Sequence, residues 1–315
     1  MKILVTGASG FAGSHLVEAL LAAGHKEVYG TAYGRDDYLR SLLPTDQVIA
    51  IDLTKADDVK QLILNLKPDW IFHLASLAFV GKSFERASEL FTNNFAVQLN
   101  MLESVRLHAP KARLLTIGSA EEYGMSEAGE IPIHEDHPLR PINPYAVSKV
   151  AQDLLAYSYA VSYKLNVIRA RPFNHIGERQ TEDFAIPAFA KQIVEIERGK
   201  SDALHVGNLK SVRDFTDVKD MVRAYILLME KGEVGEPYNI GSGIGTSMEK
   251  VVKQLISLSK SEIHIEQDST RLRPHDIPEI IAGISRMKKL GWSPAIPLEQ
   301  SLNRVLEYWR EKNNV

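Results

Sequence analysis

The feature that most limits the possible folds of this chain is an alternation of short apolar runs with helix-like patterns. Runs such as KILVTG, QVIAIDL, WIFHLAS and ARLLTIGS are largely apolar, and segments such as SHLVEALLAAG and ADDVKQLILNL lie between them. Strands that are apolar on both sides need cover on both faces, which is typical of parallel sheets made of βαβ units. We therefore expect an α/β fold with a doubly wound parallel sheet.

A glycine-rich turn, TGASGFAGSHL at residues 6–16, lies between the first expected strand and the first expected helix. Gly7, Gly10 and Gly13, with Phe11 and Ala12 between them, allow a tight turn, close approach of a pyrophosphate to the backbone, and close packing of the helix. The helix N-terminus offers its free N–H groups to the anion. The turn predicts dinucleotide binding on a Rossmann-type sheet, with an ordinary glycine turn as the alternative.

The residues after the second expected strand bear on the choice of dinucleotide. An acidic residue that binds the ribose 2′-hydroxyl is usual there, but TAYGRDD has uncharged residues followed by Arg35. An arginine suits a 2′-phosphate, so we expect NADP(H) as the cofactor. NAD(H) is the alternative, because Arg35 could be a solvated loop charge and Asp36 or Asp37 could reach a ribose.

The regular alternation weakens after about residue 170, where segments rich in Gly and Pro, such as RPFNHIGERQ and RLRPHDIPEI, lie between helices. With 315 residues, of which 44% are hydrophobic, the chain is long enough to bury a sizeable core and to form a second domain. We expect a Rossmann domain at 1–170 with 212–236, and a smaller, mostly C-terminal substrate-binding domain at 171–211 with 237–315.

Composition excludes several classes of protein. A net charge of −3 without a dense Lys/Arg run gives no electrostatic footprint for nucleic acid or for an anionic membrane. Cysteine is absent, which excludes disulfides, thiolate metal sites and a cysteine nucleophile. The histidines show no spacing typical of a metal site, so we expect no metal. The start MKILVTG lacks the features of a signal peptide, and we expect a cytoplasmic protein.

A second motif, NPYAVSK, places Tyr145 and Lys149 four residues apart, on one face of a helix that begins near Pro144. A lysine ammonium beside a phenol stabilises the phenolate and lowers the pKa of the phenol, which suits a proton donor to a nascent alkoxide. Ser119, in GSAEEYG at the end of an apolar run, can hydrogen-bond the same oxygen. The three side chains predict an acid–base site. A chance pair on an exposed helix is the alternative.

Together these motifs resemble the extended short-chain dehydrogenase/reductase superfamily, and the resemblance covers essentially the whole chain. The segments that carry it are TGASGFAG, HLAS, TNN and YAVSK. It implies a catalytic triad of Ser119, Tyr145 and Lys149. The residues that it assigns to the cofactor are Asp52 and Leu53 at the adenine end, and also Leu74, Ala75, Ser76 and Asn93.

The second half resembles the branch of that superfamily that handles GDP-linked deoxysugars, the GDP-mannose 4,6-dehydratases and the GDP-4-keto-6-deoxymannose reductases. RPFNHIG, VGNLKSVRDFTDV and RLRP carry this resemblance. Arg213 and Arg273 can clamp a pyrophosphate, and Asn174 and Asn208 can offer amide groups to sugar, phosphate or base. Simpler roles stay open, since Arg213 could pair with a carboxylate and Asn174 could fix a turn. His175 is expected beside the cofactor, or as a turn histidine.

Glu121 bears on the choice between the two enzymes. In a 4,6-dehydratase of this superfamily, a Glu two residues after the catalytic Ser or Thr handles the C5 proton and the C6 hydroxyl, and Glu121 has that position. Glu122 is expected on the opposite side of an extended backbone. A serine in place of threonine at 119, the lack of an arginine-rich loop after the second strand, and Arg179–Gln180 in place of paired arginines favour a reductase. Glu121 would then orient the substrate.

The resemblance therefore implies NAD(P)H-dependent reduction of the C4 keto group of GDP-4-dehydro-6-deoxy-D-mannose to GDP-D-rhamnose. The alternative is a GDP-mannose 4,6-dehydratase that uses Glu121 as acid and base, and a more distant one is a non-catalytic NADP-binding scaffold. Members of the superfamily commonly dimerise through two helices per subunit. We expect a homodimer with a four-helix bundle built from FTNNFAVQLNMLESV and YAVSKVAQDLLAYSYAV.

Overall fold

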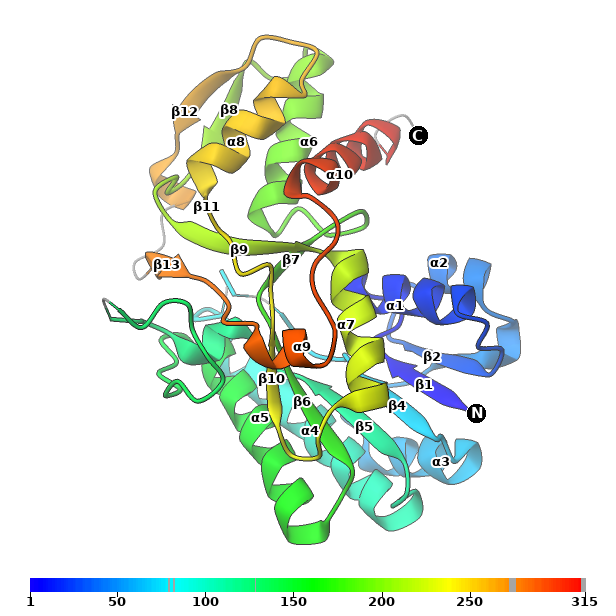
Figure 1. Cartoon of the computed structure of the whole chain (residues 1–315). Helices are drawn as coiled ribbons and strands as arrows, with labels where there is room; N and C mark the ends of the chain where they lie inside the picture. The colour runs from blue at the N-terminus through cyan, green and yellow to red at the C-terminus, as the bar shows by residue number, and fades with distance from the viewer. Residues whose placement is uncertain (79, 82, 128, 272–275, 313–315) are drawn as a thin grey trace.

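A parallel sheet of seven strands forms the larger part of the molecule, as the computed structural model in Figure 1 shows. The structure describes residues 1–78, 80–81, 83–127, 129–271 and 276–312. The order across the sheet is β10-β6-β5-β4-β1-β2-β3. The strands are β1 (Ile3–Thr6), β2 (Val28–Ala32), β3 (Val48–Ala50), β4 (Trp70–His73), β5 (Arg113–Ile117), β6 (Val167–Pro172) and β10 (Pro237–Ile240).

Helices cover both faces of this sheet, because successive strand residues point to opposite sides and both sides are apolar. In β1, for example, Ile3 and Val5 belong to one buried apolar cluster and Leu4 to the other. On the first face lie α1 (Phe11–Ala22), α2 (Asp37–Leu42) and α7 (Val218–Lys231). On the second face lie α3 (Ala56–Leu66), α4 (Ala87–His108) and α5 (Pro144–Tyr163). The expected α/β doubly wound fold is confirmed.

A smaller unit lies above the carboxyl ends of the large sheet in the view of Figure 1. In one small sheet β9 pairs with three strands, and in another β8 pairs with β12. The strands are β7 (Asn174–Ile176), β8 (Ala203–Val206), β9 (Val212–Asp217), β11 (Gly245–Ser247), β12 (His264–Gln267) and β13 (Glu279–Ile280). The helices of this unit are α6 (Ala185–Glu197), α8 (Met248–Ser257) and α10 (Leu298–Lys312), which share an apolar cluster. The short helix α9 (Ser285–Lys289) packs instead against β10 of the large sheet. Three short 3-10 turns complete the elements: η1 (Thr45–Gln47), η2 (Ala120–Tyr123) and η3 (Ser269–Arg271).

The sheets divide the chain slightly differently from the expected domain boundaries. β9, expected with the Rossmann domain, pairs with β7, β11 and β13 of the smaller unit. β10, expected with the substrate-binding domain, pairs with β6 at the edge of the large sheet. Between them α7 covers the large sheet. The segment that returns to the large sheet thus runs through α7 and β10, and α9 comes back to it once more before α10.

Candidate active site

The glycine-rich turn follows β1 at its carboxyl end and leads into α1. Gly7 has a φ of +67°, a conformation that favours glycine, and a Cβ there would lie only 2.9 Å from the backbone nitrogen of Ala75. At Gly13 a Cβ would collide with the carbonyl oxygen of Gly7. These two glycines therefore allow the turn, the β4 loop and α1 to lie in direct contact.

The turn fits a bound pyrophosphate. Gly10 is the N-cap of α1 and provides no side-chain cap, and the first turn holds no acidic residue. The first hydrogen bond within the helix runs from Ser14 N to Gly10 O at 2.9 Å. The N–H groups of Phe11, Ala12 and Gly13 therefore have no acceptor within α1, and together with the helix dipole they suit an anion.

The end of β2 carries the residues expected to select the cofactor. Arg35 is exposed on the turn between β2 and α2. Asp36 forms an ion pair with Arg40 at 2.7 Å, which turns its carboxylate toward α2. Thr31, where a carboxylate is usual, accepts a hydrogen bond from Gly7 N at 3.2 Å. Arg35 is thus exposed on this turn, while the Asp36 carboxylate is engaged by Arg40.

The expected adenine-end pair follows β3. The Asp52 carboxylate accepts hydrogen bonds from Thr54 N and Thr54 Oγ1, at 3.0 and 2.6 Å. These bonds lower the pKa of Asp52. Leu53 is buried, and its carbonyl oxygen accepts a hydrogen bond from Asn100 at 3.0 Å. Asp52 is thus fixed and charged at the edge of the sheet.

The loop after β4 brings its residues against the glycine-rich turn. Leu74, Ala75 and Ser76 are half-buried, and the backbone nitrogen of Ala75 donates to Thr6 Oγ1 at 3.3 Å. Of the pair in TNN, Asn93 is half-buried and donates to its neighbour Asn94 at 3.2 Å.

Asn94 is the fully buried member of this pair. It holds the loop by accepting from Leu77 N at 2.7 Å and donating to Leu77 O at 3.0 Å. The sequence motif marks the place, but the side chain that fixes the loop is the second asparagine and not the first.

Ser119, Tyr145 and Lys149 come together where β5 ends and α5 begins. Asn143 caps α5 by accepting from Ala146 N at 2.8 Å, so the helix starts at Pro144 and presents Tyr145 and Lys149 on its buried side. The Lys149 ammonium donates to the carbonyl oxygen of Ile117 in β5 at 3.0 Å and lies 5.9 Å from the centre of the Tyr145 ring.

Burial dominates the electrostatics of this trio. It raises the pKa of Tyr145, the hydrogen bond with Ser119 opposes that effect, and the charges of Glu121 and Glu122 add to it. It also lowers the pKa of Lys149 to about 8. The expected lowering of the Tyr145 pKa by Lys149 is therefore absent from this arrangement, because burial and two carboxylates act in the other direction. Tyr145 is held as a neutral phenol, which is the form that donates a proton.

The two carboxylates of GSAEEYG lie in the 3-10 turn η2 and not in an extended strand. The Glu121 side chain is half-buried and accepts a hydrogen bond from Asn143 at 3.0 Å. Glu122 is completely buried and accepts from the backbone nitrogen of Ser119 at 2.7 Å. The expectation that Glu122 points away from an extended backbone is wrong, because Ser119 and Glu122 form a capping box that closes a turn.

His175 lies in β7 and stacks on Phe11 of the glycine-rich turn, with ring centres 5.6 Å apart. Burial lowers its pKa, so the ring is neutral at neutral pH. Through this contact the smaller unit packs against the glycine-rich turn. The neighbouring Asn174 is exposed.

Two of the expected substrate-binding residues meet at one carboxylate. Arg213 forms an ion pair with Asp276 at 2.7 Å, and the Asn208 amide donates to the same side chain at 3.0 Å. Arg213 thus has a carboxylate partner, as the simpler interpretation of the sequence allowed. Arg273 lies outside the described residues.

Enzymes of the extended short-chain dehydrogenase/reductase type combine this doubly wound sheet and glycine-rich turn with a serine, a tyrosine and a lysine placed in this way, and the chain is one of them. More narrowly, the chain belongs to the GDP-mannose 4,6-dehydratase family, whose model matches residues 4–305. The resemblance that the sequence motifs indicated is confirmed.

Three full-length comparisons narrow the relationship. A GDP-6-deoxy-D-mannose reductase from Pseudomonas aeruginosa is 34% identical over 99% of this chain and 98% of its own. A GDP-6-deoxy-D-talose 4-dehydrogenase from Aggregatibacter actinomycetemcomitans is 31% identical over 98% of this chain and 99% of its own. The solved structure of RMD from Pseudomonas aeruginosa with NADPH matches with a TM-score of 0.86 at 31% identity, over 99% of this chain and 100% of that one.

The described residues also bear on a metal site and on a membrane-spanning helix. No group of three or more histidine, aspartate or glutamate side chains there is arranged to hold a metal ion. None of the helices in the same ranges has the length and apolar character needed to cross a membrane.

Proposed function

We propose that this protein reduces the C4 keto group of GDP-4-dehydro-6-deoxy-D-mannose and forms GDP-D-rhamnose. The observation that carries the proposal is the gathering of Ser119, Tyr145 and Lys149 at the carboxyl end of the sheet that also carries the glycine-rich turn, in a chain that is similar over its full length to a GDP-6-deoxy-D-mannose reductase. A ketone placed against the Ser119 and Tyr145 hydroxyls would meet a hydrogen-bond donor and a proton donor at once.

The residues divide the chemistry as follows. Bound at the glycine-rich turn, NAD(P)H supplies the hydride. Ser119 polarises the keto oxygen, and Tyr145, a neutral phenol because of its burial, gives its proton to the alkoxide that forms. The positive charge of Lys149 stabilises the phenolate that remains. We favour NADP(H) because an arginine, Arg35, is exposed on the turn after β2 and suits a 2′-phosphate, and because a solved relative holds NADPH.

The smaller unit would bind the GDP moiety. Asn208 and Arg213 already share the carboxylate of Asp276, so a pyrophosphate would compete with this carboxylate for the guanidinium. Asn174 is exposed on β7, next to the histidine that stacks on the cofactor turn. Arg273 keeps the substrate-binding role expected from its motif.

A GDP-mannose 4,6-dehydratase is the second candidate, and Glu121 is the observation that favours it. Its carboxylate is half-buried, fixed by Asn143, and two residues from Ser119. A dehydratase needs a base there for the C5 proton, whereas hydride transfer to a ketone does not. In the reductase, Glu121 would orient the substrate.

Assays of one purified protein with two substrates distinguish the reductase from the dehydratase. We expect GDP-mannose with NADP⁺ to give no keto product, and the 4-keto-6-deoxy sugar to oxidise NADPH in equal amount. Glu121→Gln should keep much of that activity, while Tyr145→Phe should lose about a hundredfold or more of kcat through the missing acid, with NADPH binding retained in calorimetry.

The same assay contains the result that would overturn the proposal. Formation of the 4-keto sugar from GDP-mannose by the wild type, abolished in Glu121→Gln, would make the enzyme a dehydratase. Analysis of the product determines the configuration at C4, since proton NMR couplings distinguish an equatorial C4 hydroxyl, as in GDP-D-rhamnose, from the axial one of GDP-6-deoxy-D-talose.

We further propose that the enzyme is a cytoplasmic homodimer that joins through α4 and α5. These helices pack on each other over the second face of the sheet and carry large exposed apolar side chains, namely Phe91, Leu107, Leu154, Tyr157 and Val161. Exposed apolar side chains of this size are unfavourable in water unless a partner covers them.

A further inference from the structure

Glu122 is a completely buried carboxylate to which the proposed reaction gives no task. One oxygen, Oε1, accepts the backbone N–H of Ser119 at 2.7 Å. A Cβ at Gly118 would collide with this same oxygen, so the glycine leaves room for the carboxylate. In return, the Ser119 hydroxyl accepts from the backbone nitrogen of Glu121 at 3.2 Å. The backbone and the hydroxyl of Ser119 are thus both held by hydrogen bonds within this turn.

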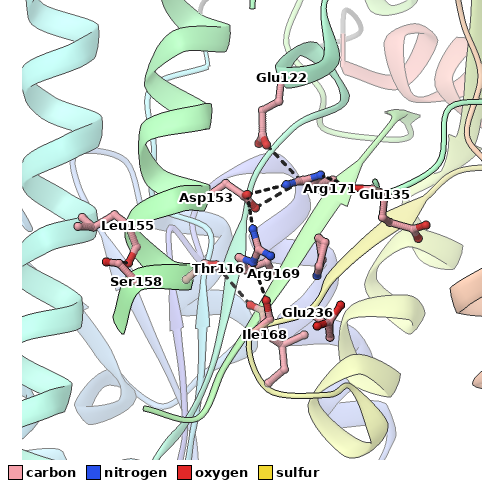
Figure 2. A network of polar contacts seen from close by, with 12 residues as sticks. Thr116, Glu122, Glu135, Asp153, Leu155, Ser158, Ile168, Arg169, Arg171 and Glu236 are labelled. Atoms are coloured by element: carbon pink, nitrogen blue, oxygen red, sulfur yellow. Dashed lines mark hydrogen bonds and ion pairs between the residues drawn. The ribbon is translucent and has the colours of Figure 1, made fainter. Parts of the chain in front are cut away.

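A chain of charged groups holds Glu122 in place, as Figure 2 shows. Arg171 on β6 lies between two carboxylates, 3.3 Å from Glu122 and 2.7 Å from Asp153 of α5. Asp153 in turn pairs with Arg169 at 2.6 Å. Arg171 also donates to Tyr123 Oη at 3.0 Å. Every one of these side chains is buried, so their geometry is strongly restrained.

The other charged groups around Glu122 come from α5. Burial and the charge of Asp153 raise the pKa of Glu122, and Arg171, the Ser119 N–H and Lys149 oppose the rise. Tyr145 on the same helix feels the charge of Glu122 as well. Glu122 therefore lies within electrostatic reach of both Lys149 and Tyr145.

We propose that Glu122 is a positioning residue for Ser119: by accepting its backbone N–H, it fixes the turn that directs the Ser119 hydroxyl toward Tyr145. The inference rests on the proposed function, in which Ser119 polarises the keto oxygen. Because a displacement of about 1 Å costs a large factor in rate, a loose Ser119 lowers kcat more than it changes KM.

Three substitutions distinguish the effect of the length of the Glu122 side chain from the effect of its charge. Glu122→Gln keeps the length and an oxygen acceptor but loses the charge, and should stay within about threefold of wild-type kcat. Glu122→Asp keeps the charge opposite Arg171, but its shorter side chain moves the acceptor oxygen away from the Ser119 N–H. Glu122→Leu removes both the charge and the acceptor. We expect these two variants to lower kcat about tenfold or more with KM and NADPH affinity little changed.

Glu135→Leu is the matched control. Glu135 is also buried and also accepts a backbone N–H, that of Asn239 at 3.0 Å, but it does not touch Ser119. It should lower the melting temperature and leave kcat within about twofold. Equal losses of kcat in Glu135→Leu and Glu122→Leu would show a general effect of a damaged core and overturn the inference.

A double-mutant cycle tests whether Glu122 acts through Ser119. In a Ser119→Ala background, Glu122→Asp should cost nothing further, because the hydroxyl that it positions is gone. The same tenfold loss in both backgrounds would contradict the proposal.

Amide exchange gives a readout that needs no substrate. In protein labelled with ¹⁵N-serine, the Ser119 amide should exchange about tenfold faster in Glu122→Asp and keep its protection in Glu122→Gln. Unchanged protection in Glu122→Asp would refute the positioning role. Should the wild type fail to oxidise NADPH with the keto sugar, the proposed function fails, while the exchange rates still decide on Glu122.

Discussion

At Tyr145 and Lys149, burial moves two pKa values in opposite directions. The phenol stays protonated well into the alkaline range, because burial and the nearby carboxylates raise its pKa. The ammonium, by contrast, loses its proton at a pH where an exposed lysine would keep it, because burial lowers its pKa to about 8. Below that pH both groups are in the forms that the reduction of a ketone needs: a neutral acid and a cation that stabilises its conjugate base.

The first prediction concerns the pH dependence of the reduction. We expect kcat to be constant through neutral pH and to fall above about pH 8, as Lys149 loses its charge while Tyr145 keeps its proton. Initial rates of NADPH oxidation across this range would measure the decline. In Lys149→Arg the guanidinium does not titrate, so the residual activity should lack that decline. An identical decline in this variant would assign it to another group.

At the scale of single elements, the sequence predicts well the strands and helices that depend on local interactions. Strands β1 to β6 and helices α1, α3, α4 and α5 lie where apolar runs and helical spacing placed them. The turn η2 was missed, although Ser119 and Glu122 show the S-x-x-E spacing of a capping box. The apolar run before it favoured a continued strand.

Other parts of the site depend on contacts between distant segments. Asp276 meets Arg213 across 63 positions of sequence, and Arg171 reaches back to Asp153 and Glu122. No periodicity in the sequence carries such pairings, because they arise only when strands and helices pack. For the same reason β10, a short strand at the sheet edge, has no local signal that assigns it to the large sheet.

The N-terminus of α5 gives a prediction for a single element. Asn143 caps the helix through its oxygen and donates to Glu121 through its nitrogen. Asn143→Ala should lower the free energy of unfolding by about 1 kcal/mol in urea denaturation. Asn143→Ser, which keeps a capping oxygen but has no amide, should recover most of that stability. If Asn143→Ser loses as much free energy of unfolding as Asn143→Ala, then the hydrogen bond to Glu121, and not the cap, stabilises the helix start.

At the scale of the whole molecule, the exposed apolar side chains on α4 and α5 predict the oligomeric state. Wild type should scatter light as a dimer at micromolar concentration. Leu154→Glu places a charge on a half-exposed leucine of α5 and should shift the protein toward monomer. Ile244→Glu, at a more exposed apolar residue of the smaller unit, should leave the mass unchanged. A monomeric wild type, or equal behaviour of the two variants, would contradict the proposed interface.

The edge strand β10 has a consequence for biosynthesis. The ribosome releases the chain from its N-terminus, so β6 stays an open sheet edge until residues 237–240 have left the exit tunnel. By then α6, β8, β9 and α7 have also emerged, and Asn239 arrives with β10 to accept a hydrogen bond from the Tyr123 hydroxyl of η2 at 2.6 Å. Until that moment β6 is open to pairing with other nascent chains. The nucleotide-binding half, although first in sequence, is completed only after most of the protein has been translated.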